Sequence, residues 1–219
     1  MAVRDILPDV RGSPADCPLA PVLHHPASMP HPPAAMPNHR GWFMFLAIAA
    51  IAAATDLVTK SALFKSLGMP GEHRGIELVP GVLSLETNLN EGALFGMGQG
   101  FGAVFAAVSL CAIAGILAMV ARPATRSDRW LLLALALITG GIIGNFYDRV
   151  GLPGLRWHAP LERRGAAVLA VRDWIHFKLD GIIDWPIFNL ADSWLVIGAG
   201  ILLLISLRAP PATDEEPTP

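Results

Sequence analysis

Four long apolar segments, each with a cluster of polar residues at one end, dominate the pattern of this chain. They cover residues 42–58, 101–120, 130–146 and 190–207. With a few flanking residues, each reaches the roughly 20 residues that an α-helix needs to cross the hydrocarbon core of a bilayer. The pattern therefore predicts an all-α membrane protein with four transmembrane helices, and an even number of spans places both termini on the same side.

The polar clusters fall on a single face of the predicted membrane domain. Successive spans run in opposite directions, so the four clusters all lie on the face opposite the termini. Ionisable residues at membrane depth are costly and are candidates for a functional site by default. The clusters contain Asp56 and Lys60 after the first span, Asn88, Asn90 and Glu91 before the second, Asn145, Asp148 and Arg149 at the end of the third, and Asn189 and Asp192 at the start of the fourth.

The connection between the first two spans has the alternation of a β-strand. In "GIELVPGVLSLETNLN", residues 75–90, β-branched and leucine residues alternate with polar ones around Pro80 and Gly81. This predicts short strands joined by a turn, a small β element between spans one and two. The connection between spans three and four, residues 151–188, is longer and mixed in character.

The composition places the chain in the membrane class and excludes one kind of partner. Hydrophobic residues make up 53% of the chain, charged residues 16%, and the mean hydropathy is +0.49. These values are too apolar for an ordinary soluble domain. The formal net charge of -2 gives no basic surface for nucleic acid. We therefore expect membrane lipids, and no nucleic acid, around this protein.

The two ends of the chain differ from the rest. Residues 1–40 contain nine prolines and scattered histidines, and residues 209–219 are acidic and proline-rich. Such segments bury too little apolar surface to offset their chain entropy. We predict a disordered N-terminal tail over 1–40, a membrane domain over 41–208 and a disordered tail over 209–219.

The carboxylates suggest the chemistry. Two aspartates held close together cannot both ionise cheaply, so they share one proton; one then acts as a base toward water while the other polarises a carbonyl group. No spacing of His, Cys, Asp or Glu resembles a zinc site, so we expect neither a metal nor a cofactor. Asp192 is the first member of such a pair, and spacing alone leaves the second open among Asp56, Asp148, Asp173, Asp180 and Asp184.

Five motifs in a fixed order resemble one known family. They are "TDLVTK", "NLNEGALFG", "GGIIGNFYDR", "VRDWIHF" and "FNLADSW", and together they resemble the lipoprotein signal peptidase (signal peptidase II) family. That resemblance implies a membrane aspartic endopeptidase that cleaves bacterial prolipoproteins just before their diacylglyceryl-modified cysteine. It implies Asp173 and Asp192 as the catalytic pair. The supporting polar residues that it implies are Asp56, Asn90, Asn145, Asp148, Arg149 and Asn189.

The resemblance also implies a location. It places a multi-pass protein in the bacterial inner membrane, with the β element and the active site on the extracytoplasmic face. The Lys and Arg residues near the spans are more numerous on the predicted active face. Taken literally, the positive-inside rule would place that face in the cytoplasm, but long loops are poor material for the rule, and we follow the resemblance.

One segment departs from the family pattern. The family joins its N-x-x-D-R motif to the first catalytic aspartate by a short loop, whereas here an insertion over residues 150–171 precedes Asp173. The apolar residues around Asp173 still match the family motif better than those around Asp180 or Asp184.

Other interpretations of the same residues remain open. A small proton or cation transporter would use the same acids, but near the membrane midplane rather than at the span ends. Asp148 with Arg149 could be an ion-paired helix end, and Asp56 with Lys60 an ordinary i,i+4 pair. Asn145 and Asn189 could cap helices, a role compatible with ordering a site.

Overall fold

The computed structural model describes residues 39–92, 98–179 and 181–208 of the chain. The predicted tails lie outside these residues, except that His39 and Arg40 form the start of the first helix. The elements in chain order are α1 (His39–Leu67), β1 (Ile76–Val79), β2 (Leu83–Asn90), α2 (Gly102–Ala121), α3 (Pro123–Ser127), α4 (Arg129–Arg149), the short 3-10 helix η2 (Leu161–Arg163), β3 (Val171–Leu179), β4 (Ile183–Asp184) and α5 (Leu190–Arg208).

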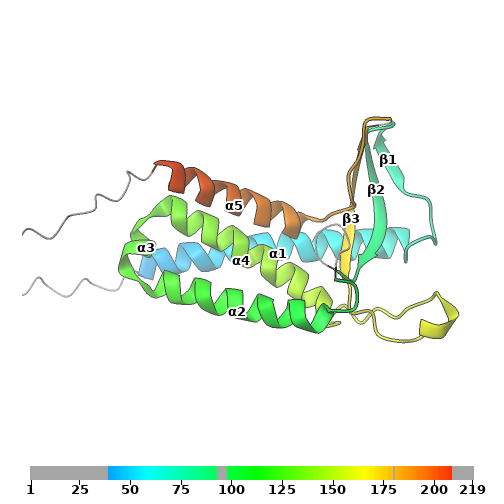
Figure 1. The fold of residues 1–219 in the computed structure, drawn as a ribbon, viewed down its shortest axis with the longest axis horizontal. Helices are drawn as coiled ribbons and strands as arrows, with labels where there is room; N and C mark the ends of the chain where they lie inside the picture. Colours follow the sequence, from blue (N-terminus) through cyan, green and yellow to red (C-terminus); the bar gives the residue numbers. More distant parts are fainter. Residues whose placement is uncertain (1–38, 93–97, 180, 209–219) are drawn as a thin grey trace, which may run out of the picture. The chain divides into compact units, whose positions relative to one another are not determined.

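Four helices are long and apolar enough to cross a membrane: α1, α2, α4 and α5. This confirms the prediction of four spans, and Figure 1 shows them running alongside one another with the sheet at one end. The first helix is longer than predicted, because Asp56 and Lys60 do not end it at a water interface but are completely buried in the bundle. With 29 residues, α1 is about 43 Å long and extends beyond the ~30 Å hydrocarbon core.

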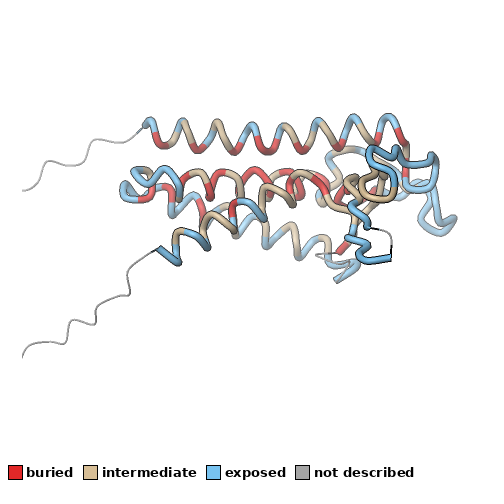
Figure 2. Tube along the Cα trace, turned by 90° about the horizontal axis from the view of Figure 1, so that it is seen from above, coloured by how far each residue is buried: buried red, intermediate tan, exposed pale blue. Residues whose placement is uncertain are grey.

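Small residues on α4 bring it close to its neighbours. A Cβ added at Gly140 would meet the Cβ of Ala52 on α1 at 2.5 Å, and one at Gly144 would collide with the carboxylate of Asp56. Glycine therefore allows α1 and α4 to pack backbone against backbone, as small residues do between membrane helices. Figure 2 shows the buried residues of α1 and α4 on the sides where the helices face each other.

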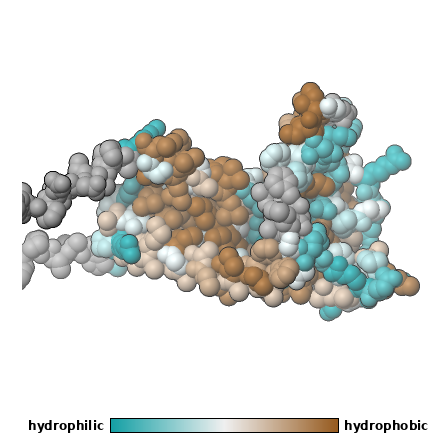
Figure 3. Space-filling model, in the orientation of Figure 1, coloured by the Kyte–Doolittle hydropathy of each residue, from teal (hydrophilic) through white to brown (hydrophobic). Residues whose placement is uncertain are grey.

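The outer sides of the helices carry apolar side chains. Phe43, Val58, Val196 and Leu207 are each more than 60% exposed. In a soluble protein such exposure would be unfavourable, but hydrocarbon is the natural environment of these side chains. Figure 3 shows the resulting hydrophobic surface along the helices, with hydrophilic residues gathered around the sheet.

The sheet is antiparallel, with the strand order β1-β2-β3-β4. The β element predicted between the first two spans is confirmed as β1 and β2. Its other half, β3 and β4, comes from the connection between α4 and α5, for which no strand was predicted. The register of β2 and β3 pairs Asn88 with Asp173 and Asn90 with Val171, so it brings two of the sequence motifs into contact.

Candidate active site

The N-terminus of α5 is built around Asn189. The side-chain oxygen of Asn189 accepts a hydrogen bond from the backbone N–H of Asp192 at 3.0 Å. The backbone N–H of Asn189 donates in return to Asp192 Oδ2 at 3.3 Å. This reciprocal arrangement is a capping box formed by Asn and Asp, and it satisfies backbone donors that a helix start otherwise leaves unpaired. The cap fixes the position of the Asp192 carboxylate at the first turn of α5.

Strand β3 reaches this helix start through the backbone. The N–H groups of Trp174 and Ile175 both donate to the carbonyl of Phe188, at 2.9 and 2.8 Å. Since successive residues of a strand point to opposite faces, Arg172 and Asp173 leave β3 in opposite directions. Asp173 points toward α5, where its Oδ1 accepts a hydrogen bond of 2.6 Å from Asn189 Nδ2.

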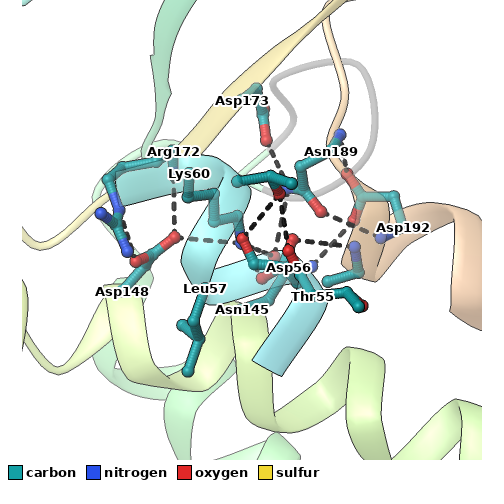
Figure 4. A network of polar contacts seen from close by, with 12 residues as sticks. Thr55, Asp56, Leu57, Lys60, Asn145, Asp148, Arg172, Asp173, Asn189 and Asp192 are labelled. Atoms are coloured by element: carbon teal, nitrogen blue, oxygen red, sulfur yellow. Dashed lines mark hydrogen bonds and ion pairs between the residues drawn. The ribbon is translucent and has the colours of Figure 1, made fainter. Parts of the chain in front are cut away.

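The two acids are therefore joined through one amide side chain. Asn189 donates to Asp173 and caps Asp192, while Asn145 of α4 donates from Nδ2 to Asp192 Oδ1 at 2.8 Å. Asn145 is held in this orientation because its oxygen accepts from Lys60 at 2.9 Å and from Asn189 at 3.2 Å. Figure 4 shows Asp173, Asn189, Asp192 and Asn145 pointing toward one another from three elements.

A buried ion network lies beneath the two acids. Lys60 Nζ is 2.7 Å from Asp56 and 3.1 Å from Asp148, and Arg172 Nε is 2.8 Å from the other oxygen of Asp148. Asp56 also accepts from the backbone N–H of Ala191 at 2.9 Å. All four charged side chains are almost fully buried, so two positive and two negative groups balance each other inside the protein (Figure 4).

The contacts decide between the interpretations left open by the sequence. The pairing of Asp148 with Arg149 is wrong, since Asp148 pairs with Lys60 and Arg172 instead. Arg149 donates to the carbonyl of Gly92 at 3.0 Å. The i,i+4 pair of Asp56 and Lys60 does form, but as part of the buried network rather than as an ordinary surface pair.

Arg172 was missed by the sequence analysis, although a signal for it existed. It is a charged residue inside the apolar stretch "AAVLAVRDWIHF" and stands next to the predicted catalytic aspartate. Its guanidinium also donates to the Ser61 hydroxyl at 3.3 Å. In a buried strand, a pair of adjacent charges has to find partners on both faces, and here the partners are Asp148 on one side and Asn189 on the other.

A cavity of about 780 Å³ opens beside Asp192, which forms part of its wall. Its volume lies in the usual range of sites that enclose a small ligand, roughly 300–1,000 Å³. The polar part of its wall includes Asn90, Asn145, Arg149 and Asp192, and the apolar part is formed by the segment before α5 and by the first turns of that helix. Apolar residues of this wall include Trp185, Pro186, Ile187, Phe188, Leu195 and Val196.

The environment of Asp173 favours its protonated form. Burial raises the pKa of Asp173 to about 7, and the negative charge of Asp192 adds to the rise, while the Asn189 hydrogen bond and the Lys60 charge oppose it. Among the described residues, no hydrogen bond to Asp173 Oδ2 has ordinary geometry. The side chain of Asn90 lies near this carboxyl group and lowers its pKa slightly, against the effect of burial.

The other candidate aspartates have different surroundings. Asp56 and Asp148 are held by cations in the ion network. Asp184 lies on β4, is 68% exposed and pairs with His176 at 2.7 Å. Asp180 lies outside the described residues. Across residues 39–92, 98–179 and 181–208, no group of three or more His, Cys, Asp or Glu side chains is placed to hold a metal ion.

Comparison with known proteins shows which family the chain belongs to. A family model described as Signal peptidase (SPase) II matches residues 48–208. The chain belongs to this family. It is 42% identical over 178 residues to the lipoprotein signal peptidase of Rhodopirellula baltica, covering 79% of this chain and 75% of that protein. It is 32% identical over 185 residues to the lipoprotein signal peptidase of Aeromonas hydrophila, covering 83% and 99% of the two chains.

The fold also resembles solved structures. Two bacterial membrane enzymes match with TM-scores of 0.63 and 0.61, at 24% and 25% identity, over 81% and 77% of this chain and 95% of each of theirs. The family predicted from the five motifs is confirmed. The chain is a multi-pass membrane protein and a peptidase of the family that cleaves the signal peptides of prolipoproteins. A transporter is thereby disfavoured.

Proposed function

We propose that the chain is an aspartic endopeptidase that removes the signal peptide from diacylglyceryl-modified prolipoproteins, cutting before the lipidated cysteine. The observation that carries this proposal is the position of Asn189, whose one side chain joins the Asp173 carboxylate to the first turn of α5, where Asp192 lines the cavity. Two carboxylates at one site, one of them with a raised pKa, are the requirement for water activation without a metal.

The two acids would divide the reaction between them. Asp173 carries the proton and donates a hydrogen bond to the carbonyl oxygen of the scissile peptide bond. Asp192 removes a proton from a water molecule, and the water oxygen attacks the carbonyl carbon. The proton then passes to the leaving amine as the C–N bond of the tetrahedral intermediate breaks, so that both acids return to their starting states.

The remaining polar residues would position these groups. Asn145 and Asn189 orient the two carboxylates, and Asp56 fixes the start of α5 through Ala191. Asp148 holds β3 through the backbone N–H of Arg172 at 3.1 Å. Asn90 and Arg149 line the cavity, where they would contact the substrate backbone or the lipid ester groups.

The apolar wall of the cavity supports a lipidated substrate. It combines the segment before α5 with residues of α5 such as Leu195 and Val196, and Val196 is 71% exposed on the lipid-facing side of the bundle. An acyl chain could therefore enter from the bilayer without crossing water. We expect the purified protein to cleave a diacylglyceryl-modified prolipoprotein peptide. The same peptide without the lipid should be cleaved at least about tenfold more slowly at equal concentration, because it loses burial of its acyl chains at ~0.8 kcal/mol per CH₂; equal rates would overturn lipid recognition.

The pH dependence of turnover would test the division of labour. Asp173 must be protonated to polarise the carbonyl, and its pKa is about 7. We therefore expect kcat/KM, whose pH dependence reports the free enzyme, to fall as the pH rises through about 7, since the proton on Asp173 is lost above that value. A kcat/KM that stays constant from pH 6 to pH 9, from roughly one unit below such a transition to two units above it, would show that Asp173 is not the acid.

We further propose that the sheet lies on the extracytoplasmic face of the inner membrane, where the mature part of an exported lipoprotein is located. Single cysteines can be introduced in a Cys17→Ala, Cys111→Ala background at three exposed positions: Arg74 and Glu162 near the sheet, and Ser127 at the opposite end of the bundle. In intact spheroplasts, a membrane-impermeant thiol reagent should label Arg74→Cys and Glu162→Cys but not Ser127→Cys. The reverse pattern would invert the orientation.

A further inference from the structure

The insertion before β3 has a defined structure of its own. Its two arms are joined by backbone hydrogen bonds, from Trp157 to the carbonyl of Ala166 at 3.0 Å and from Gly165 to the carbonyl of Trp157 at 2.9 Å. A third bond joins Val168 to the carbonyl of Leu155 at 3.0 Å. The segment is therefore a hairpin that ends in η2, and Figure 1 shows it extending beyond the helix ends on the side of the sheet.

This hairpin packs against the elements that lead to the site. Val168 and Ala170 form a small buried cluster with Met69, which follows α1, and Leu89 of β2 packs against that cluster. His158 of the hairpin also pairs with Glu72, next to Met69. These contacts fix the base of the hairpin beside the end of β2, and Leu89 immediately precedes Asn90.

One residue of the hairpin reaches back to the substrate-facing turn. Arg163 of η2 donates from both terminal nitrogens to the two carboxylate oxygens of Glu91. Its guanidinium also lies 4.1 Å from the centre of the Trp157 ring. A two-pronged pair stacked on an aromatic ring is directional, which a lysine in the same place would not provide.

Glu91 is the middle residue of a turn that carries cavity groups. The backbone N–H of Gly92 donates to Asn90 Oδ1 at 3.0 Å, and the carbonyl of Gly92 accepts from Arg149 at 3.0 Å. Asn90 and Arg149 both line the cavity. The orientation of the Glu91 peptide groups therefore sets the direction of two side chains that face the substrate.

We infer that Arg163 is a positioning residue for substrate binding: through Glu91 it holds the Asn90–Gly92 turn, and with it Asn90 and Arg149, in the shape that the substrate requires. The insertion thus belongs to the substrate site, although Arg163 itself does not line the cavity. The effect is on binding more than on chemistry, because Arg163 contacts neither Asp173 nor Asp192. This inference rests on the proposed prolipoprotein substrate.

Kinetics of Arg163→Ala on the lipidated peptide, with Arg164→Ala as the control, would test this. Arg164 is the neighbouring arginine and is also exposed. We expect Arg163→Ala to raise KM about two- to fivefold with kcat nearly unchanged, the size of effect that a partly exposed ion pair supports. Arg163→Lys should recover only part of the loss. Glu91→Gln should raise KM similarly, and the double variant should be no worse than either single one.

A second measurement keeps the test independent of turnover. Amide hydrogen exchange at residues 90–92 should be faster in Arg163→Ala than in the wild type or in Arg164→Ala, with or without substrate. If the wild type cleaves the lipidated peptide but the two arginine variants have the same KM, the positioning role is wrong while the proposed function stands. If the wild type cleaves no lipidated peptide, the proposed function fails. Unchanged amide exchange at residues 90–92 in Arg163→Ala would by itself overturn the role of Arg163.

Discussion

Replacing either Asp173 or Asp192 by asparagine is expected to lower prolipoprotein cleavage by roughly 10²–10⁴-fold, the contribution of a positioned acid or base to catalysis. In the proposed mechanism, each change removes one half of the acid–base pair but keeps the size of the side chain. In Asp173→Asn the carbonyl oxygen of the amide can still accept from Asn189, as Oδ1 of Asp173 does now. The rate constant kcat on the lipidated peptide is the measurement.

The control for this experiment is Asp184→Asn. Asp184 lies on β4, is largely exposed and pairs with His176 away from the two acids, so its replacement should leave kcat within about twofold of the wild type. Thermal unfolding in detergent would show that all three variants are folded. Near-normal turnover in Asp173→Asn would remove Asp173 from the reaction and leave Asp192 without its partner.

Replacing Lys60 by methionine is expected to cost the protein about 3–5 kcal/mol of stability, the penalty for leaving a buried charge without its partner. Lys60 pairs with Asp56 and Asp148 and is completely buried with both of them. Arg172 still neutralises Asp148 in the variant, but Asp56 loses its cation. A markedly lower melting temperature in detergent is the expected observation.

Two further variants make this result specific. Lys65 lies on the same helix but is exposed, so Lys65→Met should change stability by no more than about 0.5 kcal/mol. Adding Asp56→Asn to Lys60→Met should restore much of the loss, since the unpaired carboxylate is then gone. An unchanged melting temperature for Lys60→Met would mean that the network is weak or is hydrated in the membrane.

The spans could be predicted because hydrocarbon imposes a simple rule on composition and length. The same rule misjudged the end of α1. Asp56 and Lys60 looked like the start of the water interface, yet each satisfies the other inside the bundle. Hydropathy counts charged residues one at a time, so it cannot recognise a pair that the fold buries together with Asp148.

The sequence indicated which residues the fold would bring together in the candidate site, but not which of them would bond to one another. The resemblance to the family implied Asp173, Asn189 and Asp192, whereas the partners of Asp148 depended on the register of β3. That strand escaped detection because Val171, Arg172 and Asp173 are all buried, which removes the alternation of apolar and polar residues by which strands are found. The backbone hydrogen bonds from Trp174 and Ile175 to Phe188 fix the orientation of β3. This orientation directs Arg172 toward Asp148 on α4.

Asn189 has a consequence for how this protein would respond to heat. The first turn of a helix opens more readily than its middle, and here that turn contains both the cap of α5 and the hydrogen bonds to the two acids. Fraying of a single turn would separate Asp173 from Asp192 while the helical bundle stays intact. We therefore expect heat inactivation to be reversible and to occur below the melting temperature of the bundle, so that the upper working temperature is set by the hydrogen bonds that hold this one turn.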